Sequence, residues 1–291
     1  MKVFFITGGT GLLGYNWIKE IKDNFDIYIS ENKKKIKFNS KKKYTKSLFN
    51  KSALKKFLIK NKINIFIHCA ALSNVELCQK YSLKCIKINT KLTLLLCKIC
   101  KDLNIKFIFI SSDHLFKGNK SYYTENDKTF PLNNYALSKV IAEKKIIKIN
   151  KKALIIRTNF YGKDSLFKKS FSSKIINNLR LNRKINLFEN VFFTPILIDV
   201  LIHSVHKLID LNKSGIFNIS STQRLSKFQF GIKIAKKLNL NQKNINKITI
   251  ESLPHLVKRP KDMSLSNKKI IKYLPKSYFD INHNLNSLLK K

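Results

Sequence analysis

Tyr135 and Lys139 are the residues whose types and spacing point most directly to chemistry. They lie four positions apart at the start of the stretch PLNNYALSKVIAE, which reads as a helix. Residues four apart on a helix lie one turn apart on the same face, so the phenol and the ammonium face the same way. A lysine there would lower the pKa of the tyrosine from its usual value of about 10. The pair therefore predicts a tyrosine that acts as a proton donor.

A glycine-rich turn near the N-terminus predicts a dinucleotide site. The apolar run KVFFIT, typical of a buried strand, leads into GGTGLLG and then into a helical pattern. Gly8, Gly11 and Gly14 give the spacing G-x-x-G-x-x-G, in which a strand turns tightly into a helix whose N-terminus meets a pyrophosphate. Four of the eight glycines of the chain lie in these seven positions. A glycine turn without a ligand is the alternative, and a P-loop is excluded because no Gly-Lys-Ser/Thr follows.

Strand and helix patterns alternate through the first half of the chain. Strand-like runs occupy residues 26–30, 63–71, 106–110 and 153–158, with helical patterns between them. This alternation is typical of a parallel, doubly wound sheet. We therefore expect an α/β protein with a Rossmann-type domain over residues 1–160. A smaller C-terminal α/β substrate domain is expected over 161–291, with part of 194–220 returning to the first domain.

The end of the second strand bears on which dinucleotide is bound. Ser30 and Lys33 there would tolerate a 2′-phosphate and favour NADP, whereas Glu31 could hold the ribose of NAD. The expected cofactor is therefore NADPH or NADH. Small residues at the end of the strand at 63–71 would let the cofactor approach closely. The predicted cofactor-binding residues are Gly8, Gly11, Leu12, Leu13, Gly14, Ser30, Lys33, Ala70, Ala71, Tyr135 and Lys139.

Ser112 is expected beside the Tyr135 helix, because it follows the strand at 106–110 and ligands bind off the carboxyl ends of such strands. A serine hydroxyl, a tyrosine and a lysine can together handle a carbonyl group. The serine orients the carbonyl oxygen and the tyrosine passes the proton. The lysine supports the tyrosine and can also bond the cofactor ribose.

The chain resembles the extended short-chain dehydrogenase/reductases, and among them the dTDP-4-dehydrorhamnose reductase group of sugar-nucleotide reductases. The matching stretches run from residue 3 to about 274 and are TGGTGLLG, HCAAL, SSDHLFKG, YTEND, PLNNYALSK, IIRTNFYG, GIFNIS and RPKDMSLSN. The glycine loop and the YxxxK spacing indicate only the superfamily. SSDHLFKG and RPKDMSLSN, in this order, point to the reductase group.

The resemblance implies that Ser112, Tyr135 and Lys139 are the catalytic trio, with Asn89 supporting the lysine through water. The family more often has threonine at the position of Ser112, and serine keeps the hydroxyl. Dehydratases of this fold carry an Asp-Glu pair after the catalytic serine or threonine. Here Asp113 is followed by histidine, which favours simple reduction.

The resemblance also implies a set of substrate-binding residues: Ser112, His114, Tyr135, Phe160 and Arg259. His114 replaces a common tyrosine, and a purely structural histidine is the alternative. Phe160 stands where the best-known members have a tryptophan. Arg259 is a candidate partner for a diphosphate, because arginine grips phosphate bidentately. Ser47 takes the place of an acidic residue that usually holds adenine.

The implied function is NAD(P)H-dependent reduction of a 4-keto sugar nucleotide, for deoxysugar or surface polysaccharide synthesis. Two alternatives stay open. A sugar-nucleotide epimerase of the same fold would need no net consumption of NAD(P)H. A regulatory subunit would bind NAD(P) without turnover.

The net charge of +41 taken alone suggests nucleic acid or an anionic membrane surface. Only five of the 58 basic residues are arginines, the side chain that base readers favour, and the lysines are spread along the whole chain. Compositional drift is therefore the preferred explanation, and no specific nucleic-acid partner is expected.

The cysteines indicate a reducing compartment. There are five, an odd number, without a secretory signal, so we expect reduced thiols and a cytoplasmic protein. Cys97 and Cys100 form a CxxC inside an apolar helical run, which favours core packing over metal binding. No apolar stretch is long enough to span a membrane. We expect no metal site, and a homodimer is a candidate assembly.

Overall fold

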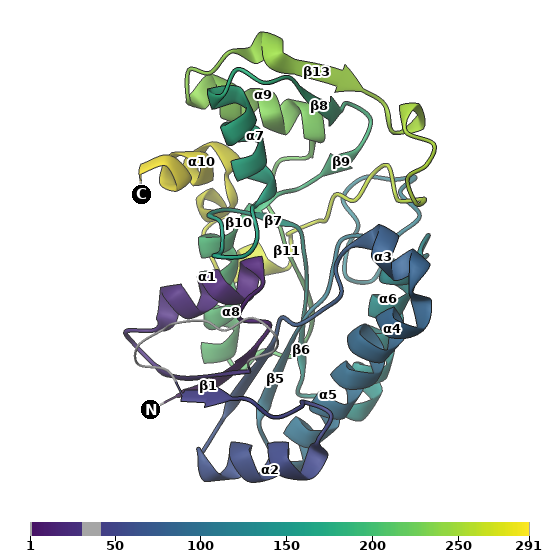
Figure 1. Cartoon of the computed structure of the whole chain (residues 1–291). Coiled ribbons are helices and arrows are strands. Elements are labelled where there is room, and N and C mark those ends of the chain that lie inside the picture. Colours follow the sequence, from purple (N-terminus) through teal and green to yellow (C-terminus); the bar gives the residue numbers. More distant parts are fainter. Residues whose placement is uncertain (1, 31–41, 291) are drawn as a thin grey trace.

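A parallel β-sheet with helices on both faces forms the larger part of the molecule (Figure 1). The computed structural model describes residues 2–30 and 42–290. The seven strands lie in the order β11-β6-β5-β4-β1-β2-β3, and every pairing is parallel. Their bounds are β1 Val3–Thr7, β2 Asp26–Ser30, β3 Lys42–Tyr44, β4 Ile65–His68, β5 Lys106–Ile110, β6 Leu154–Thr158 and β11 Gly215–Ile219.

The strands form here because their apolar side chains are buried on both faces of the sheet. Neighbouring residues of a strand point to opposite faces. In β1, Phe4 and Ile6 therefore enter one core and Phe5 enters the other. Such continuous apolar runs are typical of parallel sheets covered by helices on each side.

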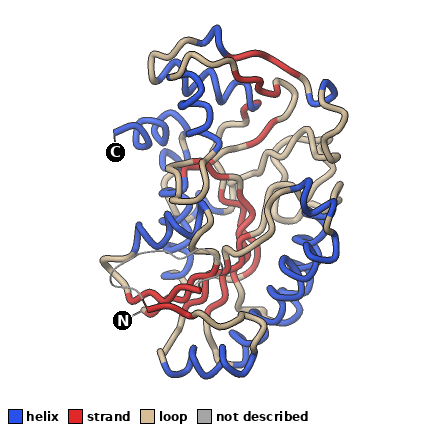
Figure 2. Tube along the Cα trace, viewed as in Figure 1, coloured by secondary structure: helices blue, strands red, loops and turns tan. Residues whose placement is uncertain are grey.

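One set of helices covers each face of the sheet, as Figures 1 and 2 show. Helices α1 and α8 pack together on one face, and α2, α5 and α6 pack on the other. A π-helical turn, η1, joins α4 to α5. The bounds are α1 Leu12–Ile21, α2 Lys51–Lys60, α3 Val75–Lys80, α4 Ser82–Ile86, η1 Lys87–Leu92, α5 Thr93–Asp102, α6 Asn134–Ile149 and α8 Ile198–Asp210.

A smaller C-terminal unit of short strands and helices lies over one end of the sheet (Figure 1). Three strand pairs, β7–β10, β8–β13 and β9–β12, build it. The bounds are β7 Phe160–Tyr161, α7 Phe171–Arg180, β8 Ile185–Phe188, β9 Phe192–Phe193, β10 Ile196–Leu197, β12 Leu225–Ser226, α9 Lys227–Lys237, β13 Ile245–Ile248 and α10 Ile281–Lys290. Short 3₁₀ turns occupy η2 Gln242–Asn244, η3 Ile250–Ser252, η4 Ile270–Lys272 and η5 Lys276–Phe279.

The expected α/β, Rossmann-type fold is confirmed. β11 pairs with β6 at the edge of the large sheet, so the chain does return there after its excursion into the C-terminal unit. The division into domains at residue 160 stays a prediction. The pattern did not reveal β3 or the two-residue strands, because elements this short have too few residues to show a period.

Candidate functional site

A cavity of about 1040 Å³ opens at the carboxyl ends of β1, β2, β4 and β5. All of the predicted cofactor-binding residues that the structure describes line it: Gly8, Gly11, Leu12, Leu13, Gly14, Ser30, Ala70, Ala71, Tyr135 and Lys139. Lys33 and Glu31 lie outside the described residues. These residues come from four separate stretches of the chain, which meet at one place.

The glycine loop lies too close to its neighbours to carry side chains at two positions. Gly8 has φ of +73°, and a Cβ there would lie 2.7 Å from the amide nitrogen of Ala70. A Cβ on Gly14 would lie 2.4 Å from the carbonyl oxygen of Gly8. Gly11 precedes α1, whose N-terminus has no side-chain cap. Unpaired N–H groups there are a ready anion site, so the loop fits the pyrophosphate of a dinucleotide.

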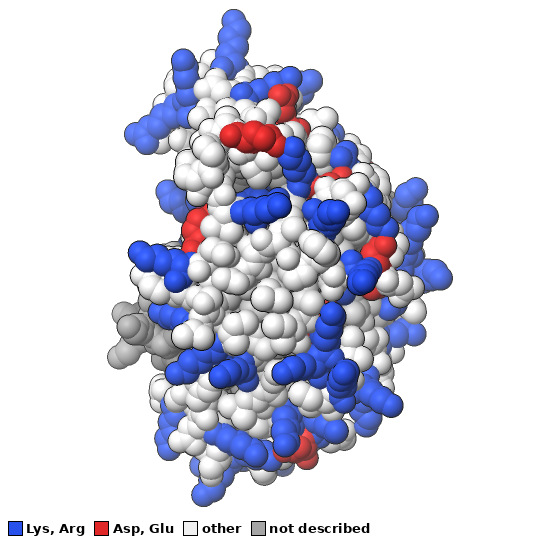
Figure 3. Space-filling model, turned by 90° about the vertical axis from the view of Figure 1, so that its right-hand side faces the viewer, with Lys and Arg blue, Asp and Glu red and all other residues white. Residues whose placement is uncertain are grey.

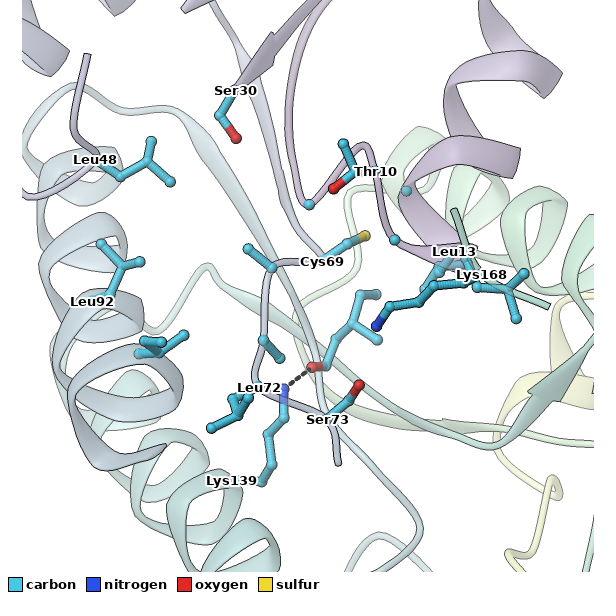
Figure 4. A pocket seen from close by; sticks show the side chains of 18 of the residues that line it. Thr10, Leu13, Ser30, Leu48, Cys69, Leu72, Ser73, Leu92, Lys139 and Lys168 are labelled. Carbon is cyan, nitrogen blue, oxygen red and sulfur yellow. Dashed lines mark hydrogen bonds between the residues drawn. The ribbon is translucent and has the colours of Figure 1, made fainter. Parts of the chain in front are cut away.

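Within residues 2–30 and 42–290, the charged side chains that line the cavity are all lysines: Lys46, Lys139, Lys168 and Lys169. In Figure 4 the side chain of Lys168 extends into the cavity from the segment between β7 and α7. That segment is held in shape by Ser165, whose Oγ accepts a hydrogen bond of 3.0 Å from the Lys168 amide. The positive charge of these lysines suits an anionic ligand.

Sequence reasoning missed three of these lysines, at positions 46, 168 and 169. They belong to loops without a motif, and lysine is too common in this chain for any single one to stand out. No local signal could have identified them.

Tyr135 and Ser112 lie close enough together for the Ser112 hydroxyl to lower the pKa of the phenol, so the two side chains of the predicted carbonyl-handling pair are neighbours. Ser112 Oγ also accepts a hydrogen bond of 3.2 Å from the amide of His114. The His114 ring stands edge-on to the Tyr135 ring, with centroids 5.8 Å apart. Asp113 follows, and its Oδ2 accepts a hydrogen bond of 2.6 Å from Asn159. The strand end at β5 and the start of α6 therefore present a hydroxyl and a phenol together.

The pKa of Tyr135 moves in the direction opposite to the expected one. Burial raises the pKa to about 12, and the nearby Ser112 hydroxyl offsets only part of the rise. Spacing on a helix does not reveal how deeply a side chain is buried, and here loss of hydration for the phenolate outweighs any nearby positive charge. Tyr135 is therefore a neutral phenol at neutral pH.

Lys139 is buried and its ammonium faces the end of β5. Its Nζ donates a hydrogen bond of 2.8 Å to the carbonyl of Ile110, drawn as a dashed line in Figure 4. Burial lowers the pKa of Lys139 to about 8, while the nearby Cys69 and Glu143 act in the opposite direction. The lysine is thus close to the pH range in which it can gain or lose its proton.

Asn89 lies behind the cavity, in the π-helical turn η1. Its side chain accepts a hydrogen bond of 2.8 Å from the amide of Leu72 and donates one of 2.9 Å to the carbonyl of the same residue. Its second N–H donates to Ser138 Oγ at 3.1 Å. Ser138 Oγ in turn donates to the carbonyl of Tyr135. Asn89 therefore joins the cavity-lining loop after β4 to the first turn of α6.

His68, at the end of β4, continues this buried network and was not singled out from the sequence. Thr93 Oγ1 donates to the carbonyl of Asn89, so it can only accept from Nε2 of His68, 3.0 Å away. Nδ1 then accepts from Thr7 Oγ1 at 2.7 Å. Thr7 Oγ1 also accepts from the amide of Ala70 at 3.2 Å. Burial lowers the pKa of His68 to about 3, which agrees with this neutral tautomer.

The predicted substrate-binding residues do not all line the cavity, unlike the predicted cofactor-binding residues that the structure describes. Tyr135 and Phe160 line the cavity, whereas Ser112, His114 and Arg259 lie outside its lining. The Arg259 guanidinium forms an ion pair with Glu76 and donates to the carbonyl of Val257. Arg259 nevertheless lies close enough to His114 to lower its pKa, although burial is the larger cause.

The structure gives less support to redox or metal chemistry at the cysteines and to nucleic-acid binding by the basic surface. Cys97 and Cys100 are buried in the packing of α5, and burial raises the pKa of Cys97 to about 12. The residues at 2–30 and 42–290 contain no group of three or more histidine, cysteine or carboxylate side chains suited to hold a metal. No helix within those ranges could cross a membrane. On the face shown in Figure 3, lysines and arginines are scattered around an uncharged centre, as compositional drift predicts.

Three curated relatives match most of this chain. A dTDP-4-dehydrorhamnose reductase from Aggregatibacter actinomycetemcomitans is 26% identical over 282 residues, or 93% of this chain and 92% of the relative. A probable low-salt glycan biosynthesis reductase from Haloferax volcanii is 24% identical, covering 88% and 87%. The beta subunit of methionine adenosyltransferase 2 from Mus musculus is 24% identical, covering 91% and 80%.

Solved structures share the fold over the full chain. A hypothetical dTDP-4-dehydrorhamnose reductase from Sulfolobus tokodaii has a TM-score of 0.84 at 26% identity and covers 98% of both chains. A dTDP-4-dehydrorhamnose reductase from Bacillus anthracis, solved in complex with NADP, has a TM-score of 0.87 at 24% identity, covering 100% of this chain and 99% of that one. The family model described as the RmlD substrate binding domain matches residues 1–291. With the glycine loop, the Ser112–Tyr135 pair and Lys139 around one cavity, the chain belongs to the RmlD substrate binding domain family.

Proposed function

We propose that this protein is an NAD(P)H-dependent reductase that acts on a 4-keto sugar nucleotide, as a dTDP-4-dehydrorhamnose reductase does. The observation that carries the proposal is the neighbouring Ser112–Tyr135 pair, which adjoins a cavity shaped by glycines and lined by lysines. A carbonyl between the serine and the tyrosine would lie beside the place where a dinucleotide fits. The reduction would serve deoxysugar or surface polysaccharide synthesis.

The residues present fit a dinucleotide. Gly8 and Gly14 leave the space that side chains would fill, and Lys168 and Lys169 add positive charge beside the glycine loop. Ser30 and Lys46 line the end of the cavity near β2 and would tolerate a 2′-phosphate, which favours NADPH over NADH. When bound, the dihydronicotinamide supplies the hydride.

The side chains of the site would handle the carbonyl oxygen. Ser112 donates a hydrogen bond that orients the oxygen, and the Tyr135 phenol gives it a proton as negative charge develops there. A phenol with a pKa of about 12 is fully protonated at neutral pH and can still give its proton to the more basic alkoxide. Lys139 would hold the cofactor ribose and stabilise the tyrosinate left behind.

An oxidation assay tests this function. Purified protein is incubated with NADPH or NADH and a panel of 4-keto nucleotide sugars, and loss of absorbance at the dihydronicotinamide band is followed. We expect turnover with at least one sugar nucleotide. Tyr135→Phe should bind the cofactor but lose most turnover, while Tyr122→Phe at an exposed position should behave as wild type. Near-wild-type turnover in Tyr135→Phe would overturn the mechanism.

Two alternatives are separated by the same assay. Similarity to the beta subunit of methionine adenosyltransferase 2 favours a regulatory subunit as the second candidate. A regulatory subunit would bind NAD(P) without turnover on any sugar. An epimerase would change the sugar without net cofactor oxidation. We further propose that the protein is cytoplasmic. We also propose that it forms a homodimer, and light scattering of the purified chain would test this assembly.

A further inference from the structure

Lys227, the first residue of α9, carries an ammonium group that has no ion-pair partner within residues 2–30 and 42–290. Its Nζ lies 3.2 Å from the centroid of the Phe193 ring and 5.1 Å from that of Phe171. Aromatic faces attract a cation, but they replace lost hydration only in part. Burial accordingly lowers the pKa of Lys227 to about 7. Such a group is stabilised when an anion comes to it.

The position of Lys227 is fixed by its surroundings. Its amide donates a hydrogen bond of 3.0 Å to the carbonyl of Val191. Ser226 and Gln229 form a capping box across it, in which the side chain of each residue accepts a hydrogen bond from the amide of the other. β12 pairs with β9 and brings the start of the helix beside Phe193. The ammonium is therefore presented by a rigid element.

Lys227 belongs to the C-terminal unit and lies near enough to the carbonyl-handling residues for their charges to influence one another. Its charge interacts with that of Asp113, directly after Ser112, and with His114. Among the described residues Asp113 pairs with His114 and not with Lys227, and its carboxylate accepts hydrogen bonds from Asn159 and Ser112. The ammonium thus lies near the carbonyl site, and it donates no hydrogen bond to another residue within 2–30 and 42–290.

We propose that Lys227 binds the diphosphate of the sugar-nucleotide substrate. The inference rests on the proposed function and names a residue for the anionic half of that substrate. In a 4-keto sugar the carbonyl and the phosphate-bearing carbon lie on opposite sides of the ring. A carbonyl held by Ser112 and Tyr135 therefore directs the phosphates away from Tyr135, toward the C-terminal unit. Arg259 is less suited, because its guanidinium is already paired with Glu76.

The test compares Lys227→Met with Lys227→Arg and with Lys236→Met, an exposed lysine later in the same helix. Binding of dTDP and UDP alone is measured by calorimetry, binding of NADPH by fluorescence, and folding by circular dichroism. Lys227→Met should weaken nucleoside diphosphate binding about tenfold or more, the usual loss for a hydrogen bond to a charged group. It should raise KM with little change in kcat and leave NADPH affinity unchanged. Lys227→Arg should restore much of the affinity, and Lys236→Met should match wild type.

Three results would overturn the proposal. Unchanged dTDP and UDP binding in folded Lys227→Met would exclude contact with the diphosphate. A lower kcat at constant KM would assign Lys227 to the carbonyl through Asp113 instead. Loss of affinity in Lys227→Arg equal to that in Lys227→Met would show that packing, and not charge, is involved. Failure of the proposed function is distinct, because wild-type protein would then reduce no sugar nucleotide at all.

Discussion

The side-chain amide of Asn89 donates a hydrogen bond of 3.1 Å to Ser138 Oγ. This bond joins the π-helical turn behind the cavity to the helix that carries Tyr135 and Lys139. Asn89 also forms hydrogen bonds with both the N–H and the C=O of Leu72. This one residue therefore sets the distance between the loop that faces the cofactor and the helix that carries the proton donor. Single π-helical turns often occur at functional sites, and here the turn presents a buried amide with every hydrogen bond satisfied.

Replacement of this amide should loosen both elements together. Asn89→Ala removes the acceptor of the Leu72 N–H and leaves the Leu72 C=O with the weak Cys78 thiol donor alone, which should destabilise the protein by about 1–3 kcal/mol. We expect weaker NADPH binding and a lower turnover, measured by fluorescence titration and by the oxidation assay. Asn178→Ala, which removes an amide bonded only within α7, is the control. Equal losses in both variants would contradict the role of Asn89 in placing the loop.

The histidine behind the cavity should make the protein sensitive to mild acid. The pKa of His68 is lowered to about 3 in the folded state by burial, so between pH 3 and 6.5 the unfolded chain binds a proton that the folded one does not. Stability is therefore complete above the unfolded pKa and falls as the pH drops below it. By pH 5 the loss from this residue should reach about 2 kcal/mol.

Urea unfolding between pH 5 and 7 measures this loss. His68→Gln should show a pH slope smaller by about one proton than the wild-type slope. His283→Gln, at an exposed position of α10, should keep the wild-type slope. Parallel slopes for wild type and His68→Gln would show that the acid sensitivity arises elsewhere.

Two glycine substitutions should distinguish the effect of a steric clash from the effect of backbone strain. Gly14→Ala would place a methyl group 2.4 Å from the carbonyl oxygen of Gly8, so the loop must move and NADPH binding should fall by more than tenfold. Gly215→Ala has φ of +85° but no atom within 4 Å. It should cost about 1–2 kcal/mol of stability through strain alone and leave cofactor binding unchanged. Wild-type NADPH affinity in Gly14→Ala would mean that the dinucleotide does not use this loop.

Lys168 should contribute to cofactor binding through its charge. The lysine is exposed and reaches into the cavity (Figure 4), so a solvent-screened contact with phosphate is expected. Lys168→Ala should raise the Kd of NADPH about two- to fivefold and reduce its dependence on salt. Lys174→Ala, exposed on α7, should not. An unaltered Kd and salt slope in Lys168→Ala would place its ammonium away from the phosphates.

The sequence by itself determined the features that depend on neighbours along the chain. The glycine spacing, the four-residue step from Tyr135 to Lys139 and the alternation of strands with helices are all local, and each was found where the pattern predicted it. The position of Ser112 could be inferred as well, because strand ends of a parallel sheet meet at one edge. Local geometry is decided by sterics and hydrogen bonds within a few residues, so it can be predicted from sequence.

Only the tertiary structure decided what depends on residues far apart. Lys168 and Lys227 come from the C-terminal unit, and the sequence does not distinguish them from the other lysines. Only the fold places Lys168 at the cavity and Lys227 near Asp113. The network from His68 through Asn89 joins β4, η1 and α6, which no spacing along the chain reveals. The pKa of Tyr135 was expected to fall and instead rises to about 12. Loss of hydration is set by everything that packs around the phenol, whereas the sequence shows only the lysine four residues away.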